Sequence, residues 1–270
     1  MNAEAIEQLS PLAKDLRAQN PDRYLATLFA PAACRSSLIA LFAFDHEIAR
    51  AQWNMREPMA GLIRLQWWQD VINGFTQHGV VAHPVVRELQ RAVNENGLDK
   101  VHLERAIEGR RRRLEDDGPL DPKAFERYLL DVGGSILCAA SELLGGSEPE
   151  MLATANRVGL VSASLEQLRF LQMPGADFKA WSPTNWSEEG SQEVADSPNT
   201  AAPRCLADWA LTALAEVRRQ KASIPRSVLP AFFPGTLAGI RLRDPIRKNN
   251  LRPLPTAVPR LIWCWMRRRF

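Results

Sequence analysis

Apolar side chains recur every three or four residues through the first two thirds of this 270-residue chain. Between residues 58 and 75 they stand at Leu62, Leu65, Trp68, Val71 and Ile72, which share one face of an α-helix. Segments of the same kind cover residues 3–20, 31–53, 83–97, 99–118, 121–146 and 148–173. The alternating Val, Ile and Thr runs that indicate strands are absent from the sequence. The spacing therefore predicts an all-α fold.

Composition places the chain among ordinary globular proteins. Apolar residues make up 46% and charged residues 24%, and 270 residues can bury a substantial core. The formal net charge of +3 is too small to indicate a nucleic-acid partner, so none is expected. Four cysteines lie far apart without a CxxC pair, which favours isolated thiols in a reducing compartment.

The ends of the chain bear on location and on domain organisation. No apolar run approaches the about 20 residues that span a bilayer, and residues 1–20 lack the pattern of a signal or transit peptide. We expect a cytoplasmic protein, or one peripheral to the inner face of a membrane. One domain over residues 1–270 is predicted, with an irregular, flap-like segment at 174–204 that is rich in Pro, Ser and acidic residues.

Three polar features are candidate sites. The first is "LIALFAFDHEIARAQW" (38–53), where His46, Glu47 and Arg50 follow an apolar helix and either line a pocket or form a solvated helix end. The run from Arg110 to Arg113 could bind phosphates, although a solvated face near a helix C-terminus is the stronger interpretation. Asp116 and Asp117 could contribute to a metal site, but here too a solvated helix end is favoured. None of these features supplies a nucleophile with a base, so no catalytic residue is assigned.

Five segments carry a resemblance when they are read in order. They are "DRYLATLFAPAACRSSLIALFAF" (22–44), "RLQWWQDVINGF" (64–75), "IEGRRRRLEDD" (107–117), "YLLDVGGSILCAASELLG" (128–145) and "RVGLVSASLEQLRFLQ" (157–172). Their order and spacing resemble the squalene/phytoene synthase superfamily over about residues 22–175. The resemblance implies a single-domain, isoprenoid-synthase-type helical bundle around a central cavity.

Members of that superfamily join two prenyl diphosphates head to head, with Mg²⁺ held by two DxxxD motifs. An i, i+4 pair of carboxylates points both acids the same way, so that the ions can neutralise the departing diphosphate. Aligned without gaps, the four Asp positions hold Ala49, Trp53, Phe170 and Pro174 in this chain. The resemblance therefore implies that both magnesium motifs are degenerate, that no metal or other cofactor is bound, and that Mg²⁺ is needed only if an active enzyme remains.

The chain is more similar to a nonenzymatic branch of the superfamily, which includes a mitochondrial complex I assembly factor. The similar stretches are "AFDHEIARAQ" (43–52), "GLIRLQWWQD" (61–70) and "KNNLRPLPTAVPRLIWCW" (248–265). This resemblance implies a non-catalytic assembly or binding factor for a membrane respiratory complex. Two alternatives stay open: an active head-to-head prenyltransferase, using Asp45, Glu47, Asp116 and Asp117, and a carrier of an isoprenoid or other lipid.

The resemblance also assigns a vestigial pocket for a prenyl diphosphate. Its expected substrate-binding residues are Tyr24, Arg35, His46, Arg50 and Arg169. Of these, Arg35, Arg50 and Arg169 are expected to give the mouth of the pocket a positive field. The apolar lining is expected from Leu41, Phe42, Val132, Ile136, Val161 and Leu165.

The C-terminal stretch "LIWCWMRRRF" combines aromatic and basic residues. In one interpretation it is a last helix packed on the core, which hides both Trp263 and Trp265. In the other it is a peripheral contact with a membrane, which leaves at least one of the two exposed, because Trp prefers the interface and clustered Arg is attracted to anionic lipid.

Overall fold

The computed structural model is all-helical over the residues that it describes, which are 10–53, 57–76, 82–116, 121–171, 198–219, 224–243 and 257–270. The helices are α2 (Pro11–Gln19), α3 (Pro21–Leu28), α4 (Ala32–Trp53), α5 (Pro58–Asn73), α6 (Pro84–Glu95), α7 (Lys100–Glu115), α8 (Pro122–Leu129), α9 (Ser135–Leu143), α10 (Pro149–Leu171), α13 (Pro198–Arg219), α14 (Leu229–Arg241) and α15 (Ala257–Arg267). A 3-10 turn, η1 (Gly74–Thr76), follows α5, and a π-helical turn, η2 (Leu130–Gly134), joins α8 to α9. The predicted all-α class is confirmed.

Several helices begin where the sequence supplies a starting signal. Proline occupies the first turn of α2, α3, α5, α6 and α8, where its fixed φ is already helical and its missing N–H is not needed. The side chains of Ser10, Asn20, Asp99 and Asp121 accept hydrogen bonds from the first exposed N–H groups of their helices. These signals explain why α5, α6, α7 and α8 begin within one residue of the predicted segments. By contrast, α2 begins inside the predicted segment 3–20, and α3 was not predicted as a helix.

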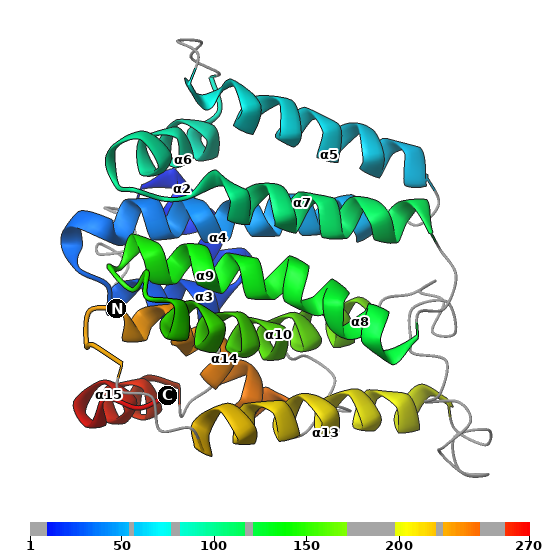
Figure 1. Ribbon diagram of the computed structural model, residues 1–270, viewed down its shortest axis with the longest axis vertical. Helices are drawn as coiled ribbons and strands as arrows, with labels where there is room; N and C mark the ends of the chain where they lie inside the picture. The colour runs from blue at the N-terminus through cyan, green and yellow to red at the C-terminus, as the bar shows by residue number, and fades with distance from the viewer. Residues whose placement is uncertain are drawn as a thin grey trace.

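Helix α10 is the centre of the bundle and contacts η2, α9, α13 and α14. The helices are stacked along the long axis of the molecule, with α5 at one end and α13 and α15 at the other (Figure 1). One apolar cluster extends from α2 through α9 to α14 and α15, and a second joins α8, α10, α13 and α14. Because α14 contributes to both clusters, the bundle forms a single domain.

Two glycines form a close contact between η2 and α10. A side chain at Gly133 would place its Cβ 2.5 Å from the carbonyl oxygen of Gly159, and one at Gly159 would place it 2.3 Å from the oxygen of Gly133. Only residues without a Cβ allow η2 and α10 to approach so closely. This contact brings α7, η2 and α10 together around the polar cluster described below.

The six residues expected to line a central cavity are all buried. Leu41, Phe42 and Ile136 belong to the larger apolar cluster, and Val132, Val161 and Leu165 to the smaller. Of the six, Leu165 lines a polar cavity of about 10 Å³, which has room for about one water molecule. A central cavity of isoprenoid size stays a prediction.

The segment predicted to be irregular, 174–204, is helical at its end. Residues 174–197 lie outside the described residues, whereas 198–204 form the first turns of α13, so helix resumes at Pro198 and not at Cys205 as the composition suggested. Proline at the first helical position favours this earlier start. No described helix is long and apolar enough to cross a membrane.

Candidate functional site

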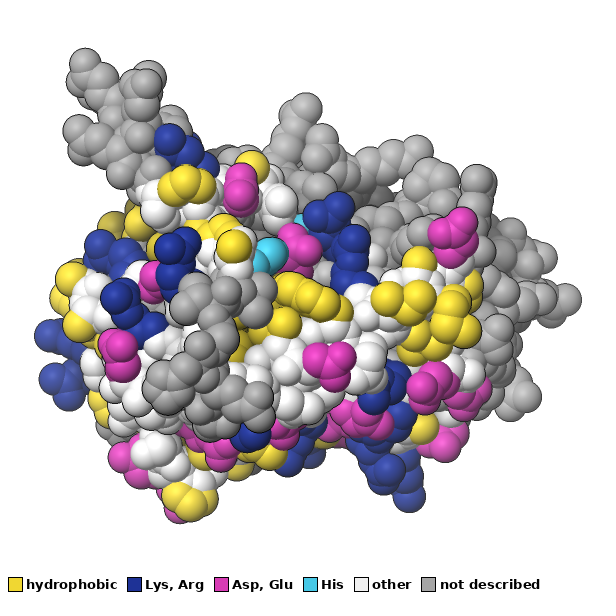
Figure 2. Space-filling model, turned by 90° about the horizontal axis from the view of Figure 1, so that it is seen from above, with side chains coloured by type: hydrophobic (Ala, Val, Ile, Leu, Met, Phe, Trp, Pro, Cys, Tyr) yellow, Lys and Arg dark blue, Asp and Glu magenta, His cyan; other side chains and the backbone are white. Residues whose placement is uncertain are grey.

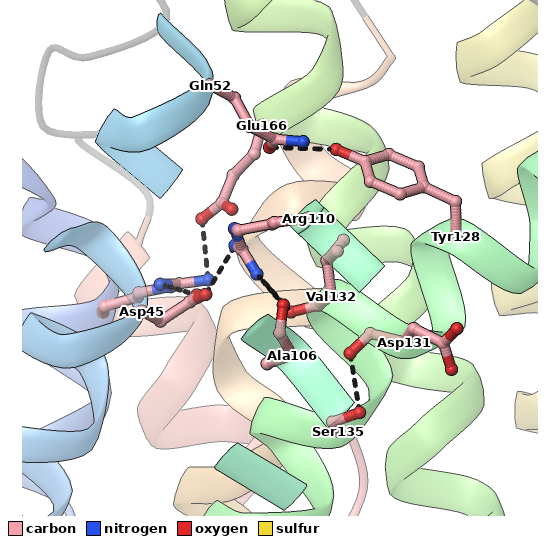
Figure 3. Close-up of polar contacts among 10 residues, drawn as sticks. Asp45, Gln52, Ala106, Arg110, Tyr128, Asp131, Val132, Ser135 and Glu166 are labelled. Atoms are coloured by element: carbon pink, nitrogen blue, oxygen red, sulfur yellow. Dashed lines mark hydrogen bonds and ion pairs between the residues drawn. The ribbon is translucent and has the colours of Figure 1, made fainter. Parts of the chain in front are cut away.

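A cluster of buried charges lies where α3, α4, α7 and α10 meet. Asp45 on α4 forms an ion pair with Arg23 of α3, and its other oxygen accepts a 2.6 Å hydrogen bond from Arg110 of α7. Arg23 also pairs with Glu166 of α10 at 2.7 Å. The side chains of Arg23, Arg110 and Asp45 are at most 3% exposed. Figure 3 shows the carboxylates of Asp45 and Glu166 converging beside the Arg110 guanidinium.

Arg110 bonds to three different elements of the bundle, α4, α7 and η2. It also donates to the carbonyl oxygens of Ala106 at 3.3 Å and Val132 at 3.4 Å, at the start of the close contact made by η2. Beside it, the Tyr128 hydroxyl donates to Gln52 at 3.1 Å (Figure 3). The two terminal nitrogens of this buried guanidinium are thus bonded, while its Nε has no partner among the described residues. Loss of the bond to Asp45 would leave a buried charge unsatisfied.

A second part of the cluster joins α3, early in the chain, to α14, late in the chain. Asp22 accepts two hydrogen bonds from Arg241 of α14, the second at 2.8 Å, and lies 3.8 Å from Arg169 of α10. Arg169 is close enough to Glu166 for their charges to interact, so both parts form one network. We call it the arginine–carboxylate cluster; its members are Asp22, Arg23, Asp45, Arg110, Glu166, Arg169 and Arg241.

Burial and charge shift the pKa values of several groups here. Burial raises the pKa of Glu166, against the attraction of Arg23. Burial and the charge of Arg23 lower the pKa of His46 to about 4, so this imidazole is neutral at pH 7. Burial also lowers the pKa of Arg169 to about 10, which leaves it charged at neutral pH. With four arginines and three carboxylates, the cluster retains a small excess of positive charge.

The residues present at this cluster do not fit a magnesium ion. Such ions need carboxylate oxygens that are free to act as ligands. Asp22, Asp45 and Glu166 instead accept bonds from guanidinium groups. Within the described ranges, no three His, Cys, Asp or Glu side chains come together as a possible metal site.

The five predicted substrate-binding residues are dispersed. Arg169 and Glu166 both line the 10 Å³ cavity. His46 is close enough to Arg23 and Asp45 for their charges to shift its pKa. Tyr24 follows Arg23 on α3, and its hydroxyl is buried without a hydrogen-bond partner in the part of the chain that the structure describes. Arg35 donates to the carbonyl oxygens of residues 27, 28 and 30, which closes the C-terminal end of α3.

The positive mouth stays a prediction, because the described cavity at Arg169 is lined by one of its three arginines. Arg50 is 46% exposed and lies 3.7 Å from Glu47, one turn earlier on α4. Neither it nor Arg35 is among the residues that line the cavity at Arg169. The helix-end interpretation of Glu47 and Arg50 agrees with this geometry, whereas His46 faces the charged cluster.

The four positions aligned with the family's magnesium ligands are only partly described. Ala49 and Phe170 are buried, at 9% and 5% exposure, and offer no ligand oxygen in their side chains. Trp53 is the last residue of α4, and its side chain lies outside the described part. Pro174 lies outside the described residues altogether.

The interpretation of residues 110–113 as a solvated face was wrong for half of the run. Arg110 and Arg113 are buried, at 2% and 3% exposure, while Arg112 is exposed. The reason is helical phase: Leu103, Ala106 and Ile107 precede Arg110 on the same buried face of α7. Asp116 is exposed at the end of α7, as predicted, and Asp117 lies outside the described residues.

Sequence reasoning missed most members of the cluster. Asp22, Arg23 and Arg241 were not singled out, and Glu166 was passed over within the apolar stretch "VSASLEQL". A charged residue on an otherwise apolar helix face is a usable signal, since buried charges are nearly always paired. That signal finds Arg110, Asp45 and Glu166, but it does not say which residue pairs with which.

Comparison with known proteins accounts for this architecture. The family model for squalene/phytoene synthase matches residues 16–261. The mouse protein "NADH dehydrogenase (ubiquinone) complex I, assembly factor 6" is 26% identical over 86% of this chain and 71% of its own length. Its Drosophila melanogaster homolog is 35% identical over 57% of this chain and 48% of its own.

Solved structures show the same fold. A dehydrosqualene synthase crystallised with a ligand superposes with a TM-score of 0.71, covering 95% of this chain and 94% of the other at 18% identity. At that identity the likeness concerns the fold alone. Together with the family match over most of its length, it establishes that the chain belongs to the squalene/phytoene synthase family.

Proposed function

We propose that this chain is a non-catalytic assembly factor for a membrane-bound respiratory complex of the NADH dehydrogenase type. The observation that carries the proposal is the arginine–carboxylate cluster, in which the carboxylates at the centre of the bundle bind guanidinium groups. The names of the mouse and Drosophila relatives support the same role. In this role the protein needs neither Mg²⁺ nor another cofactor.

The cluster opposes prenyl transfer for a physical reason. To bind metal, Asp45 would have to release Arg23 and Arg110, both buried. Removing one partner from a buried ion pair costs about 3–5 kcal/mol, because the remaining charge is left without compensation. Ionisation of a prenyl diphosphate needs the opposite arrangement, with metal ions that neutralise the leaving group.

A lipid carrier is less well supported than an assembly factor. The cavity at Arg169 holds about 10 Å³, whereas ligand pockets are typically about 300–1,000 Å³. A larger pocket of about 610 Å³ lies between α7 and α8, but Arg112, Arg127 and Asp131 are among the charged residues that line it. An isoprenoid chain would be recognised by apolar side chains, so this lining does not suit it.

The proposed site of action is the inner face of the membrane that carries the complex. All four cysteines are free thiols, which suits a reducing compartment. The proposed partner is a subunit or an assembly intermediate of the complex.

Deletion of the gene in its own host tests the proposal. We expect less fully assembled NADH dehydrogenase on native gels, with assembly restored by the wild-type gene. In parallel, the purified chain is incubated with farnesyl or geranylgeranyl diphosphate and Mg²⁺. Pyrophosphate release above the level of a heat-denatured sample, or normal assembly of the complex in the deletion strain, would contradict the proposal.

A further inference from the structure

Helix α15 packs against the bundle with one face only. Ala257, Leu261 and Cys264 are buried in the larger apolar cluster. The opposite face carries large apolar side chains with high exposed fractions: Val258 44%, Ile262 43%, Trp263 43%, Trp265 37% and Met266 55%. Of the two interpretations of the C-terminal stretch, packing that hides both tryptophans is wrong, because both are exposed.

The charged side chains of the α15 segment itself are all of one sign. Residues 257–270 contain four arginines and no acidic residue. The guanidinium of Arg260 lies 5.0 Å from the ring centre of Trp263, and that of Arg226 lies 5.1 Å from the ring centre of Trp265. Each of these two indole rings therefore has a guanidinium over its face, and no acid of this helix is available to pair with the cations.

A neighbouring arginine, Arg218, also lies close to other positive charges. Arg218 of α13 donates to the carbonyl oxygen of Phe270 at 2.8 Å and so contacts the end of the α15 segment. Burial lowers the pKa of Arg218, and the positive charges of Arg260 and Arg243 lower it further. Arg218 therefore lies in a region where Arg243 and Arg260 add positive charge near the α15 segment.

We propose that α15 docks the protein on the surface of an anionic phospholipid membrane, with its axis in the plane of the interface. Trp side chains prefer the boundary between water and hydrocarbon, and each Arg near an anionic surface contributes about 1 kcal/mol. Eleven residues are too few to span a bilayer, so the helix lies on the membrane and does not cross it.

A second exposed apolar stripe, on α5, lacks this combination. Met59, Ile63 and Trp67 are 66%, 65% and 40% exposed, but Arg64 and Asp70 on the same helix carry opposite charges. Seen from the α5 end, hydrophobic side chains are interspersed with both cationic and acidic ones (Figure 2). The α5 stripe lies at the opposite end of the long axis from α15 (Figure 1), so one flat membrane cannot contact both.

The test is co-sedimentation of the full chain with lipid vesicles. We expect binding to vesicles of phosphatidylcholine mixed with phosphatidylglycerol, much weaker binding to pure phosphatidylcholine, and weakening by salt as the attraction is screened. Absence of binding to the mixed vesicles overturns the inference. Because the vesicles contain no protein, this result is independent of the assembly role, which can stand or fall on its own.

Two sets of substitutions localise the contact. Arg267→Gln, Arg268→Gln and Arg269→Gln together should weaken partitioning about 100-fold, since each loses about 1 kcal/mol. Trp263→Ser with Trp265→Ser should weaken it as well, through loss of the interfacial rings. Circular dichroism and thermal unfolding check that each variant is folded.

The matched control is Met59→Ser with Ile63→Ser, which removes apolar side chains of similar or greater exposure from α5. This variant should bind vesicles like the wild type. Equal binding by the α15 variants, or equal loss in the α5 control, overturns the inference. If the α15 variants bind vesicles normally but fail to restore the complex in cells, α15 is a protein-binding surface, and the membrane contact is again overturned.

Discussion

Arg110 and Arg112 stand two residues apart in one run of arginines, and the fold gives them opposite surroundings. Arg110 is 2% exposed and pairs with Asp45, whereas the Arg112 side chain is 49% exposed and pairs with Asp131 at 2.8 Å. A buried pair leaves a costly charge behind when one partner is removed, whereas an exposed pair is replaced by water. An arginine therefore contributes much more to the stability of the fold at position 110 than at position 112.

Substitution of these two arginines should separate the two effects. Arg110→Ala should lower the free energy of unfolding by about 3–5 kcal/mol, because Asp45 loses a buried partner. Arg112→Ala on the same helix should cost less than about 1 kcal/mol, because solvent screens the pair. Urea denaturation measures both. Similar losses for the two variants would contradict the assignment of Arg110 to a buried network.

His46 should give the stability a distinct pH dependence. An unfolded histidine takes up a proton below about pH 6.5, whereas His46 in the folded protein does so only near pH 4. Between these values the unfolded state binds more protons, so the free energy of unfolding falls as the pH falls. After allowance for the partial exposure of the ring, we expect a loss of about 2 kcal/mol.

The variant His46→Gln has no such titration and serves as the reference. Between pH 6.5 and 4, the free energy of unfolding of this variant should fall by about 2 kcal/mol less than that of the wild type. Chemical denaturation across this pH range measures the difference. Parallel profiles for the two proteins would show that another group controls acid stability.

The polar residues could be predicted from the sequence only in part. Asp45 and His46 were recognised as polar groups at the end of an apolar helix, and Arg112 and Asp116 as solvated. The burial of Arg110 could have been read from its phase with Leu103 and Ala106. Pairing is different, because nothing in one sequence says that Asp45 meets Arg23 and Arg110.

Among the helices, the glycine contact between η2 and α10 sets how closely two elements pack. Gly133 and Gly159 face each other backbone to backbone. The sequence predicts a helix through each of these segments, since apolar periodicity is long and regular there. It does not predict their separation, which depends on which faces meet.

Gly159→Ala should therefore be strongly destabilising. Its Cβ would lie 2.3 Å from the oxygen of Gly133, and rigid backbone cannot yield cheaply, so we expect a loss of about 1–3 kcal/mol or more. Gly74→Ala is the control, because its Cβ would meet nothing within 4 Å and its backbone is right-handed helical. That variant should be neutral or gain up to about 1 kcal/mol. Thermal and urea denaturation compare them, and equal effects would contradict the tight contact.

Across the whole molecule, the bond between Asp22 and Arg241 joins residues 219 positions apart. It ties α3, near the beginning of the chain, to α14, near its end. The order of five short segments was enough to predict the family and hence this overall arrangement, and the family match over residues 16–261 confirms it. The pairing of Asp22 with Arg241 could not be predicted from the sequence, because neither residue stands in an unusual local context.

A double-mutant cycle should reveal this tie. Asp22→Ala and Arg241→Ala are expected to show a coupling of about 2 kcal/mol in the free energy of unfolding, since the pair is buried and bidentate. The exposed pair of Arg91 and Glu95, 3.5 Å apart on α6, should show less than about 0.5 kcal/mol. Additive effects of the first two substitutions would mean that the ends of the chain are stabilised independently.

The π-helical turn at Leu130–Gly134 has a consequence for how sequences of this kind are aligned. A π-turn contains one more residue than an α-helical turn, so it shifts the numbering of everything after it relative to an uninterrupted helix. A homologue whose α8 and α9 form one continuous α-helix would match this chain on both sides of the turn only with a one-residue gap inside it. Without that gap, Gly133 would be compared with a neighbour that points about 100° away around the helix.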